Sequence, residues 1–292
     1  MHLIEQKLRD YHPNSALEQD IALTEIVQQF ILFGLARSGF FADAAFHGGT
    51  CLRILFGLPR FSEDLDFVLK TPDRTFGWGK HLRVICAECA AYGVDLEVKD
   101  RARGTGAVRA AFLKTDSLGM VARASLPFGR HPRRKVVVKL EIDTDPPAGC
   151  VFQPGFLTFP GPAAVTVLDG PSGFAGKLHA LLCRAYVKGR DWYDLLWYAE
   201  RGMMPNLSLL ANALHQAGPW VGQEKAIDLD WVLEELTRKI RSIDWAATRG
   251  DVARFVPARE QKSLELWGEA LFLNVVERMR RNWLQGGPAF RG

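Results

Sequence analysis

Two aspartates that stand two residues apart, Asp64 and Asp66, form the clearest chemical pattern in the chain. Residues 65–69 have the composition of a strand, and residues i and i+2 of a strand share a face, so both carboxylates are expected to point into one site. Two close carboxylates repel each other unless a cation lies between them, and Mg²⁺ prefers oxygen ligands. The spacing therefore predicts a Mg²⁺ site, although solvated acids of a surface turn would have the same spacing.

A glycine-rich turn, Gly48-Gly49-Thr50, precedes these aspartates and opens a segment that is expected to form a helix over residues 50–55. Glycines let the backbone approach a ligand closely, and the free N–H groups at a helix N-terminus favour negative charge. We therefore expect this turn to bind phosphate groups. Residues 57–60 read as a second turn, which carries the cation of Arg60, and Ser62 follows it.

Residues 136–143 form the clearest strand pattern, and Lys139, Glu141 and Asp143 share one of its faces by the period of two. The solvent face of any strand would show the same alternation. The segment from Lys99 to Lys139 contains eleven Lys or Arg residues and two acids. Such an excess of positive charge is typical either of a surface that binds a polyanion or of a solvated surface, and both interpretations are open.

A second block lies in residues 172–202. Lys177, Leu181, Arg184 and Lys188 fall at helical spacing on one face, which is either a functional or a solvated face. We expect Gly189 to end this helix and the next helix to begin at Arg190-Asp191. Asp194 is expected only to cap that helix or to pair within it.

The other expected elements follow from hydrophobic periodicity. Helices are predicted over residues 15–40 and 76–92, and strands over residues 44–47 and 94–98. Residues 145–162 read as a loop because they are rich in Pro and Gly. Four helical segments are expected in the C-terminal part, over residues 207–217, 229–240, 244–255 and 264–283.

The composition describes a globular chain with ample core, since 48% of its 292 residues are hydrophobic and 24% are charged. The net charge of +4 does not by itself indicate nucleic acid. The polar N-terminus does not resemble a signal peptide, and the longest apolar run, residues 31–36, is too short to cross a bilayer. Five cysteines without regular spacing fit reduced thiols, so we expect a cytoplasmic protein.

Both sequence blocks resemble one known family. Gly-Gly-Thr followed by Arg-x-Ser-x-Asp-x-Asp is similar to the DNA polymerase β-like nucleotidyltransferase superfamily, and more narrowly to the AbiEii/AbiGii toxins of bacterial type IV toxin–antitoxin and abortive-infection systems. Lys-x-x-Ala-x-x-x-Arg followed by Arg-Asp-x-x-Asp-Leu resembles the second signature of the same toxin family. The resemblance covers residues 46–198.

The resemblance implies an α+β fold: a polymerase β-like core with a small mixed sheet over residues 1–168, then a helical C-terminal domain over residues 169–292 that completes the active-site cleft. It implies a Mg²⁺-dependent toxin enzyme that transfers NMP from an NTP to an acceptor. The expected acceptor is RNA, at the 3′ end of tRNA. A cognate antitoxin protein is the expected partner, and no membrane is involved.

The resemblance also implies roles for residues. Asp64 and Asp66 would be catalytic and would bind Mg²⁺, with Glu141 as a third ligand or base and Asp143 as the second choice for that position. Lys177 would match the essential lysine of the family. The other expected catalytic residue is Asp191, and the residues expected to bind phosphate or pyrophosphate are Gly48, Gly49, Thr50, Arg60, Ser62 and Lys177.

Two other classes of function stay open. The chain could be a non-catalytic module that binds a nucleotide or a protein partner, but an intact pair of aspartates argues against a dead site. It could also be a small-molecule nucleotidyltransferase of the antibiotic-modifying kind. Such an enzyme needs an acidic acceptor pocket for aminoglycosides, whereas the middle of this chain is strongly basic.

Overall fold

The computed structural model describes residues 2–100, 107–115, 128, 135–223 and 225–284. The chain divides into two compact units. The sheet unit consists of Met1–Leu55, Ser62–Pro146 and Phe152–Val167. The helical unit consists of Phe56–Phe61, Pro147–Val151 and Leu168–Gly292, so two short stretches of the N-terminal half belong to it.

A mixed seven-stranded sheet forms the centre of the sheet unit, in the order β3-β4-β5-β2-β1-β7-β6. The central strand β2 runs parallel to β5 and antiparallel to β1. Strand β4 is antiparallel to both β3 and β5, and β1 is parallel to β7. The strands are β1 (Ala44–His47), β2 (Asp64–Leu69), β3 (Glu97–Asp100), β4 (Val108–Thr115), β5 (Val136–Asp143), β6 (Phe152–Leu157) and β7 (Ala163–Leu168).

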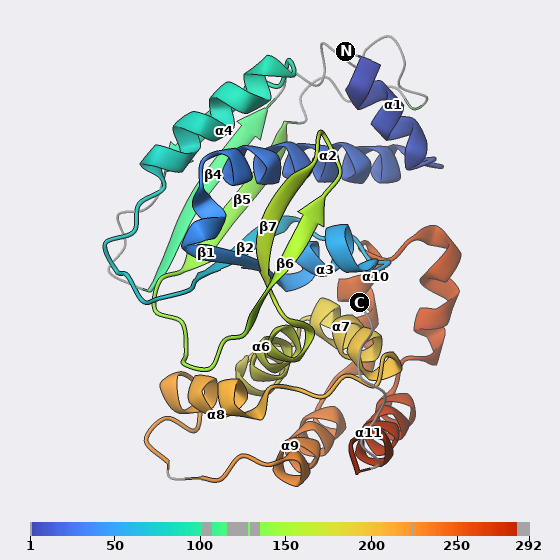
Figure 1. Cartoon of the computed structure of the whole chain (residues 1–292). Helices are drawn as coiled ribbons and strands as arrows, with labels where there is room; N and C mark the ends of the chain where they lie inside the picture. Colours follow the sequence, from blue (N-terminus) through green and yellow to red (C-terminus); the bar gives the residue numbers. More distant parts are fainter. Residues whose placement is uncertain (1, 101–106, 116–127, 129–134, 224, 285–292) are drawn as a thin grey trace. The chain divides into compact units, whose positions relative to one another are not determined.

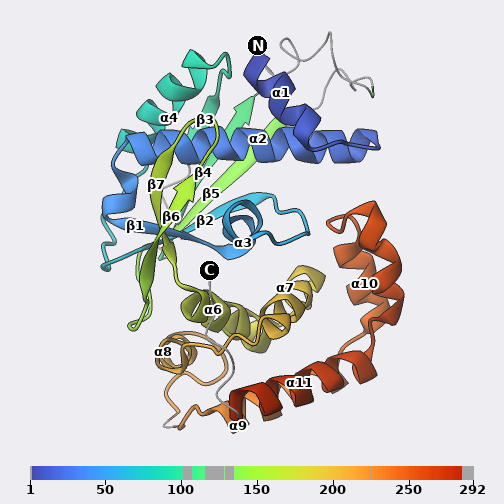
Figure 2. The same ribbon diagram turned by 45° about the vertical axis from the view of Figure 1, so that its right-hand side comes forward.

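Helices bury one face of this sheet, and the side chains along its strands alternate between buried and more exposed positions. In β5, Val138, Leu140 and Ile142 are buried while Lys139 and Glu141 are half-buried on the other face. The helix α2 (Ala16–Arg37) runs across the sheet, as Figures 1 and 2 show. It packs against α4 (Gly79–Ala91) and β5. Two shorter helices, α1 (His2–Asp10) and α3 (Gly48–Phe56), and the 3-10 helix η1 (Phe40–Ala42) complete the unit.

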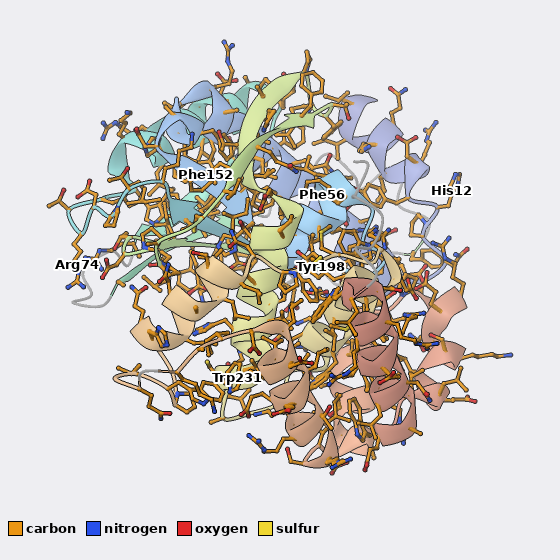
Figure 3. The ribbon with its side chains drawn as sticks, turned by 60° about the horizontal axis from the view of Figure 1, so that its bottom comes forward. His12, Phe56, Arg74, Phe152, Tyr198 and Trp231 are labelled. Atoms are coloured by element: carbon orange, nitrogen blue, oxygen red, sulfur yellow. The ribbon has the colours of Figure 1, made fainter. Side chains whose placement is uncertain are left out.

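The helical unit contains the helices α6 (Gly170–Cys183), α7 (Gly189–Glu200), α8 (Leu207–Gln216), α9 (Leu229–Arg241), α10 (Trp245–Ala253), α11 (Glu269–Leu284) and the 3-10 helix η2 (Ala258–Leu266). Asp169 caps α6 by accepting a hydrogen bond from the amide N–H of Ser172. Aromatic rings fill the core, where Phe174 stacks on Tyr198 with 4.6 Å between centroids. Figure 3 labels two buried core aromatics, Tyr198 on α7 and Trp231 on α9.

The predicted α+β architecture with a mixed sheet and a helical C-terminal part is confirmed. The prediction of a loop over residues 145–162 is wrong, because β6 lies there. Pro154 and Gly155 are tolerated in β6 because it is an edge strand. Strand β3 begins at Glu97 rather than at residue 94. In the described part of the chain, no helix has the length and apolar character needed to cross a membrane.

Candidate nucleotidyl-transfer site

The two aspartates of the predicted metal site open strand β2 and lie half-buried on its less covered face. The parallel pairing of β2 with β5 places Asp66 opposite Glu141 and Asp64 opposite Lys139. Paired residues of neighbouring strands share a face, about 5 Å apart in the backbone. Asp143 lies opposite the buried Val68, beyond both aspartates. The register therefore favours Glu141 over Asp143 as the third carboxylate.

One lysine accompanies this acidic face, which we define as Asp64, Asp66 and Glu141. The Lys139 ammonium lies 2.7 Å from Glu141 Oε1, and about a third of each side chain is exposed. The sequence placed Lys139 on one strand face with Glu141 but assigned it no role.

The acidic face offers only carboxylate oxygens, the ligand type that suits Mg²⁺. Among the residues that the structure describes, no three His, Cys, Asp or Glu side chains are grouped closely enough to hold a metal ion. The donor chemistry fits a divalent cation, and the metal site itself stays a prediction.

The turn between β1 and α3 brings a helix N-terminus to the acidic face. His47, the last residue of β1, pairs with Asp66, so the next residue, Gly48, starts α3 beside that carboxylate. Gly48 has φ +79°, and a Cβ on it would lie 2.5 Å from Asp66 Oδ2. This position needs glycine, because other residues rarely adopt this φ and any Cβ would collide with Asp66.

Thr50 has a structural role that differs from the predicted one. Its side chain is fully buried, and its hydroxyl donates a 2.5 Å hydrogen bond to the backbone carbonyl of Asp64. The side chain therefore ties α3 to β2, and phosphate binding by Thr50 stays a prediction. Gly49 is also buried. Gly48 and Ser62, both half-buried, stay predicted phosphate contacts.

The segment that leads into β2 is held by Gln28, a buried residue of α2 that sequence reasoning missed. Its side-chain amide donates hydrogen bonds to the carbonyls of Ser62 and Glu63, at 3.2 and 2.8 Å. Gln28 lies among apolar residues of a predicted helix, which could have identified it, because a buried side-chain amide needs hydrogen-bond partners. Gln28 thus fixes the start of the strand that carries the aspartates.

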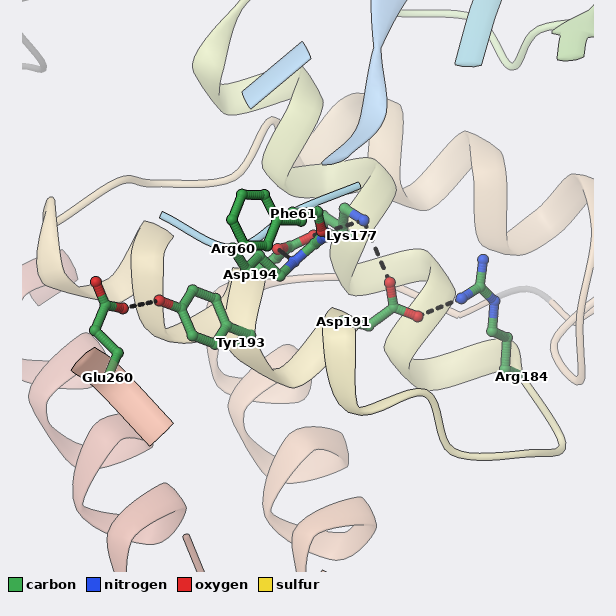
Figure 4. Close-up of polar contacts among 8 residues, drawn as sticks. All are labelled: Arg60, Phe61, Lys177, Arg184, Asp191, Tyr193, Asp194 and Glu260. Carbon is green, nitrogen blue, oxygen red and sulfur yellow. Dashed lines mark hydrogen bonds and ion pairs between the residues drawn. The ribbon is translucent and has the colours of Figure 1, made fainter. Parts of the chain in front are cut away.

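A buried ion-pair cluster occupies the helical unit (Figure 4). Arg60 binds Asp194 with two hydrogen bonds, Nε to Oδ1 at 2.6 Å and Nη2 to Oδ2 at 2.7 Å. Lys177 of α6 lies 2.7 Å from Asp194 Oδ2 and 3.3 Å from Asp191 Oδ1. Asp191 also pairs with Arg184. We call Arg60, Lys177, Asp191 and Asp194 the ion-pair cluster.

The pKa values in this cluster follow from its pairing. Burial alone would raise the pKa of Asp194, but Arg60 and Lys177 outweigh it and hold that pKa below its usual value. Burial would likewise lower the pKa of Lys177, but Asp194 and Asp191 raise it above its usual value. Both residues are therefore ionised at neutral pH.

Arg60 and Asp194 have partners that the sequence did not indicate. Arg60 is 2% exposed, and its guanidinium holds Asp194 and donates to the carbonyl of Phe61. Its contact with pyrophosphate stays a prediction. Asp194 does not cap or pair within its own helix, since both of its partners come from other segments. Its contact with Arg60 spans 134 residues of sequence, a distance over which local spacing carries no information.

The helix that carries Lys177 is shorter than predicted. It ends at Cys183, and Arg184 already has an extended backbone. Gly189 begins α7 rather than ending α6. The position needs glycine because a Cβ would lie 2.5 Å from the carbonyl oxygen of Thr248. Lys177 and Arg184 therefore share the partner Asp191 but not a helix.

The basic segment from Lys99 to Lys139 lies partly outside the described residues. Five of its cations are described: Lys99, Arg109, Lys114, Lys135 and Lys139. Its densest part, residues 130–134, is among those not described. Two of the described cations have acidic partners, Lys135 with Glu97 and Lys139 with Glu141. Binding of a polyanion by this segment stays a prediction.

Comparisons with known proteins give the family and the fold of the chain. The family model "Nucleotidyl transferase AbiEii toxin, Type IV TA system" matches residues 31–272. A solved structure of a proposed nucleotidyltransferase from H. pylori is 15% identical with a TM-score of 0.51, and the match covers 91% of this chain and 97% of that chain. JHP933 from Helicobacter pylori is 17% identical with a TM-score of 0.52, over 89% of this chain and 91% of that chain. These likenesses show the fold. No curated protein matches the chain.

Proposed function

Because the chain belongs to the family of AbiEii nucleotidyltransferase toxins of type IV toxin–antitoxin systems, we propose that it transfers a nucleoside monophosphate from an NTP to an RNA acceptor. The acceptor hydroxyl attacks the α-phosphorus, a new O–P bond forms, and the bond to the β-phosphate oxygen breaks to release pyrophosphate. The 3′ end of tRNA is the proposed acceptor, and a cognate antitoxin is the proposed protein partner.

One observation carries this proposal: the N-terminus of α3 and the carboxylates of β2 and β5 converge in one unit. Gly48 approaches Asp66 so closely that a Cβ would collide with its carboxylate, and Glu141 is the register partner of Asp66. Backbone N–H groups that can bind phosphate therefore stand beside oxygens that can bind a cation.

The residues of the sheet unit have different roles in the proposed reaction. Asp64 and Asp66 would hold Mg²⁺, which when bound would neutralise the triphosphate and favour the ionised acceptor hydroxyl. Gly48 and Ser62 bind phosphate oxygens. Glu141, whose side chain is 31% exposed, accepts the hydroxyl proton and passes it to solvent.

Lys177 and Asp191 are the proposed contribution of the helical unit. Lys177 uses two of its three N–H donors on Asp191 and Asp194, which leaves one for a phosphate of the leaving pyrophosphate. Its side chain is 16% exposed. Asp191 orients the ammonium, and Arg184 adds positive charge on the other side of Asp191.

The test is incubation of the purified protein with Mg²⁺, total bacterial RNA and each α-³²P-labelled NTP in turn. We expect label on an RNA band of tRNA size with a preferred NTP, and no label with Asp64→Ala. Label on a small molecule, or none on any RNA, would reject the RNA-acceptor reaction. Equal labelling by Asp64→Ala would reject the carboxylate mechanism.

A further inference from the structure

The loop between α6 and α7, residues 184–188, exposes an aromatic ring among cations. Tyr186 is 61% exposed and Val187 is 37% exposed. Residues 184–190 contain three cations, Arg184, Lys188 and Arg190, and no acid. The Lys188 ammonium lies 5.9 Å from the centre of the Tyr186 ring.

Contacts hold both ends of this loop in place. At its start, Lys239 of α9 donates a 3.0 Å hydrogen bond to the carbonyl of Arg184, whose guanidinium pairs with Asp191. At its end, the amide of Gly189 donates a 2.8 Å hydrogen bond to Asp251 of α10. The exposed ring therefore belongs to an anchored loop, which lowers the entropy lost when a ligand binds.

The chemistry of the loop fits an unpaired base of a nucleic acid. A tyrosine face stacks on any base, and neighbouring cations neutralise the phosphates on either side of it. A protein partner would need about 800 Å² of surface on this side. The loop offers only Tyr186 and Val187 as exposed large apolar side chains.

We propose that the α6–α7 loop binds single-stranded RNA, with Tyr186 stacking on one unpaired base and Lys188 contacting the adjacent phosphate. This inference rests on the proposed function, because the bound strand is the acceptor of that reaction. Arg184 links the loop to the ion-pair cluster through Asp191, so bound RNA lies next to Lys177.

The test measures the fluorescence anisotropy of a fluorescein-labelled oligouridylate strand, with Asp64→Ala as the parent so that binding is separated from transfer. Tyr186→Ala is expected to raise Kd about 5- to 100-fold, while Tyr186→Phe and Tyr186→Trp keep the parent Kd. Lys188→Ala is expected to lower the slope of log Kd against log salt by about 1. Phe156→Ala, at a ring that is 60% exposed in the sheet unit, is the matched control and should change nothing.

A Kd for Tyr186→Ala within about twofold of the parent would overturn the inference, and so would an equal loss with Phe156→Ala. Unchanged RNA binding together with lost binding of a protein partner would assign the loop to that partner instead. The two proposals fail separately. If the otherwise unaltered chain labels no RNA, the transfer reaction fails; if it labels RNA and Tyr186→Ala binds normally, only the loop assignment fails.

Discussion

The acidic face of the sheet unit and the ion-pair cluster of the helical unit contain similar side chains in opposite surroundings. On the acidic face, three half-exposed carboxylates and Lys139 leave a formal charge of −2. In the ion-pair cluster, the two buried carboxylates are balanced by Arg60 and Lys177, which leaves a formal charge of 0. Arg184, which pairs with Asp191 from outside the cluster, adds one positive charge.

This difference separates partly exposed carboxylates, which a cation from solvent can reach, from carboxylates that are buried together with their cationic partners. Close carboxylates with some exposure are stabilised by an added cation. Buried carboxylates with bidentate and ammonium partners are stabilised by those partners, and removing one leaves an uncompensated buried charge. We therefore expect changes on the acidic face to affect catalysis, and changes at the centre of the cluster to affect folding.

The largest effect is expected from Asp64→Ala. Loss of one carboxylate removes a cation ligand that stabilises charge in the transition state, so labelling of RNA should fall about 10³-fold or more. Urea unfolding should be unchanged. Asp143→Ala is the matched control on the same face, since Asp143 lies opposite Val68, and it should keep most activity. A greater loss with Asp143→Ala than with Glu141→Gln would show that the third carboxylate was chosen wrongly.

Asp194→Ala is expected to destabilise the protein by about 3–5 kcal/mol, because Arg60 would stay buried without its carboxylate. Asp191→Ala should cost less, since its partner Arg184 is 35% exposed. Urea titrations followed by tryptophan fluorescence measure both. Equal unfolding free energies for Asp194→Ala and the parent would contradict a structural role for this pair.

Gly48→Ala should reduce labelling about 100-fold, because the new Cβ displaces Asp66 or the start of α3 by a fraction of an ångström. Gly57→Ala is the matched control. Gly57 has a similar φ of +73°, but a Cβ there meets no atom within 4 Å. If both variants lose the same activity, backbone strain rather than the collision is responsible.

The pH dependence of stability follows from the directions of the two shifted pKa values. The folded pKa of Asp194 is lowered, so its contribution is present above the unfolded value near 3.8 and is lost as pH falls through the folded value. The folded pKa of Lys177 is raised, so its contribution is present below 10.5 and is lost as pH rises through the folded value. The free energies of unfolding of the parent and of Asp194→Asn should therefore converge in strong acid. A difference between them that stays constant down to low pH would contradict the pairing of Asp194 with its cations.

The smallest effect is expected from Lys139→Met. Removing the ammonium frees Glu141 and makes the acidic face more negative, so Mn²⁺ should bind about two- to fivefold more tightly. Electron paramagnetic resonance of free Mn²⁺ measures this without any turnover. Weaker binding would mean that Lys139 does not compete with the cation.

The sequence was sufficient for features that depend on local spacing. The alternation of Val136–Asp143 predicted β5 with its correct bounds. The helix predicted from residue 15 is α2, whose cap Ser15 accepts a hydrogen bond from the amide of Glu18. Gly48 at a helix start and Asp64 with Asp66 on one strand face were predicted in the same way.

Features that depend on distant partners could not be predicted. The contacts of Thr50 and Arg60 were not predicted, because each side chain binds a backbone or carboxylate group that only folding brings near. The strand β6 was missed because Pro154 and Gly155 mark a loop unless the strand lies at a sheet edge. The role of Gln28 was missed because its partners, the carbonyls of Ser62 and Glu63, lie 34 and 35 residues away in sequence.

The most direct test of the central contrast measures activity and stability together for two isosteric variants, Asp66→Asn and Asp194→Asn. Because the acidic face is proposed to bind the cation, we expect Asp66→Asn to lose RNA labelling and Mn²⁺ binding while its urea midpoint equals that of the parent. Because Asp194 pairs with buried cations, we expect Asp194→Asn to lower the urea midpoint. If instead Asp66→Asn still labels RNA at the parent rate, or Asp194→Asn unfolds at the parent urea concentration, the division between a catalytic sheet face and a structural Arg60–Asp194 pair is contradicted.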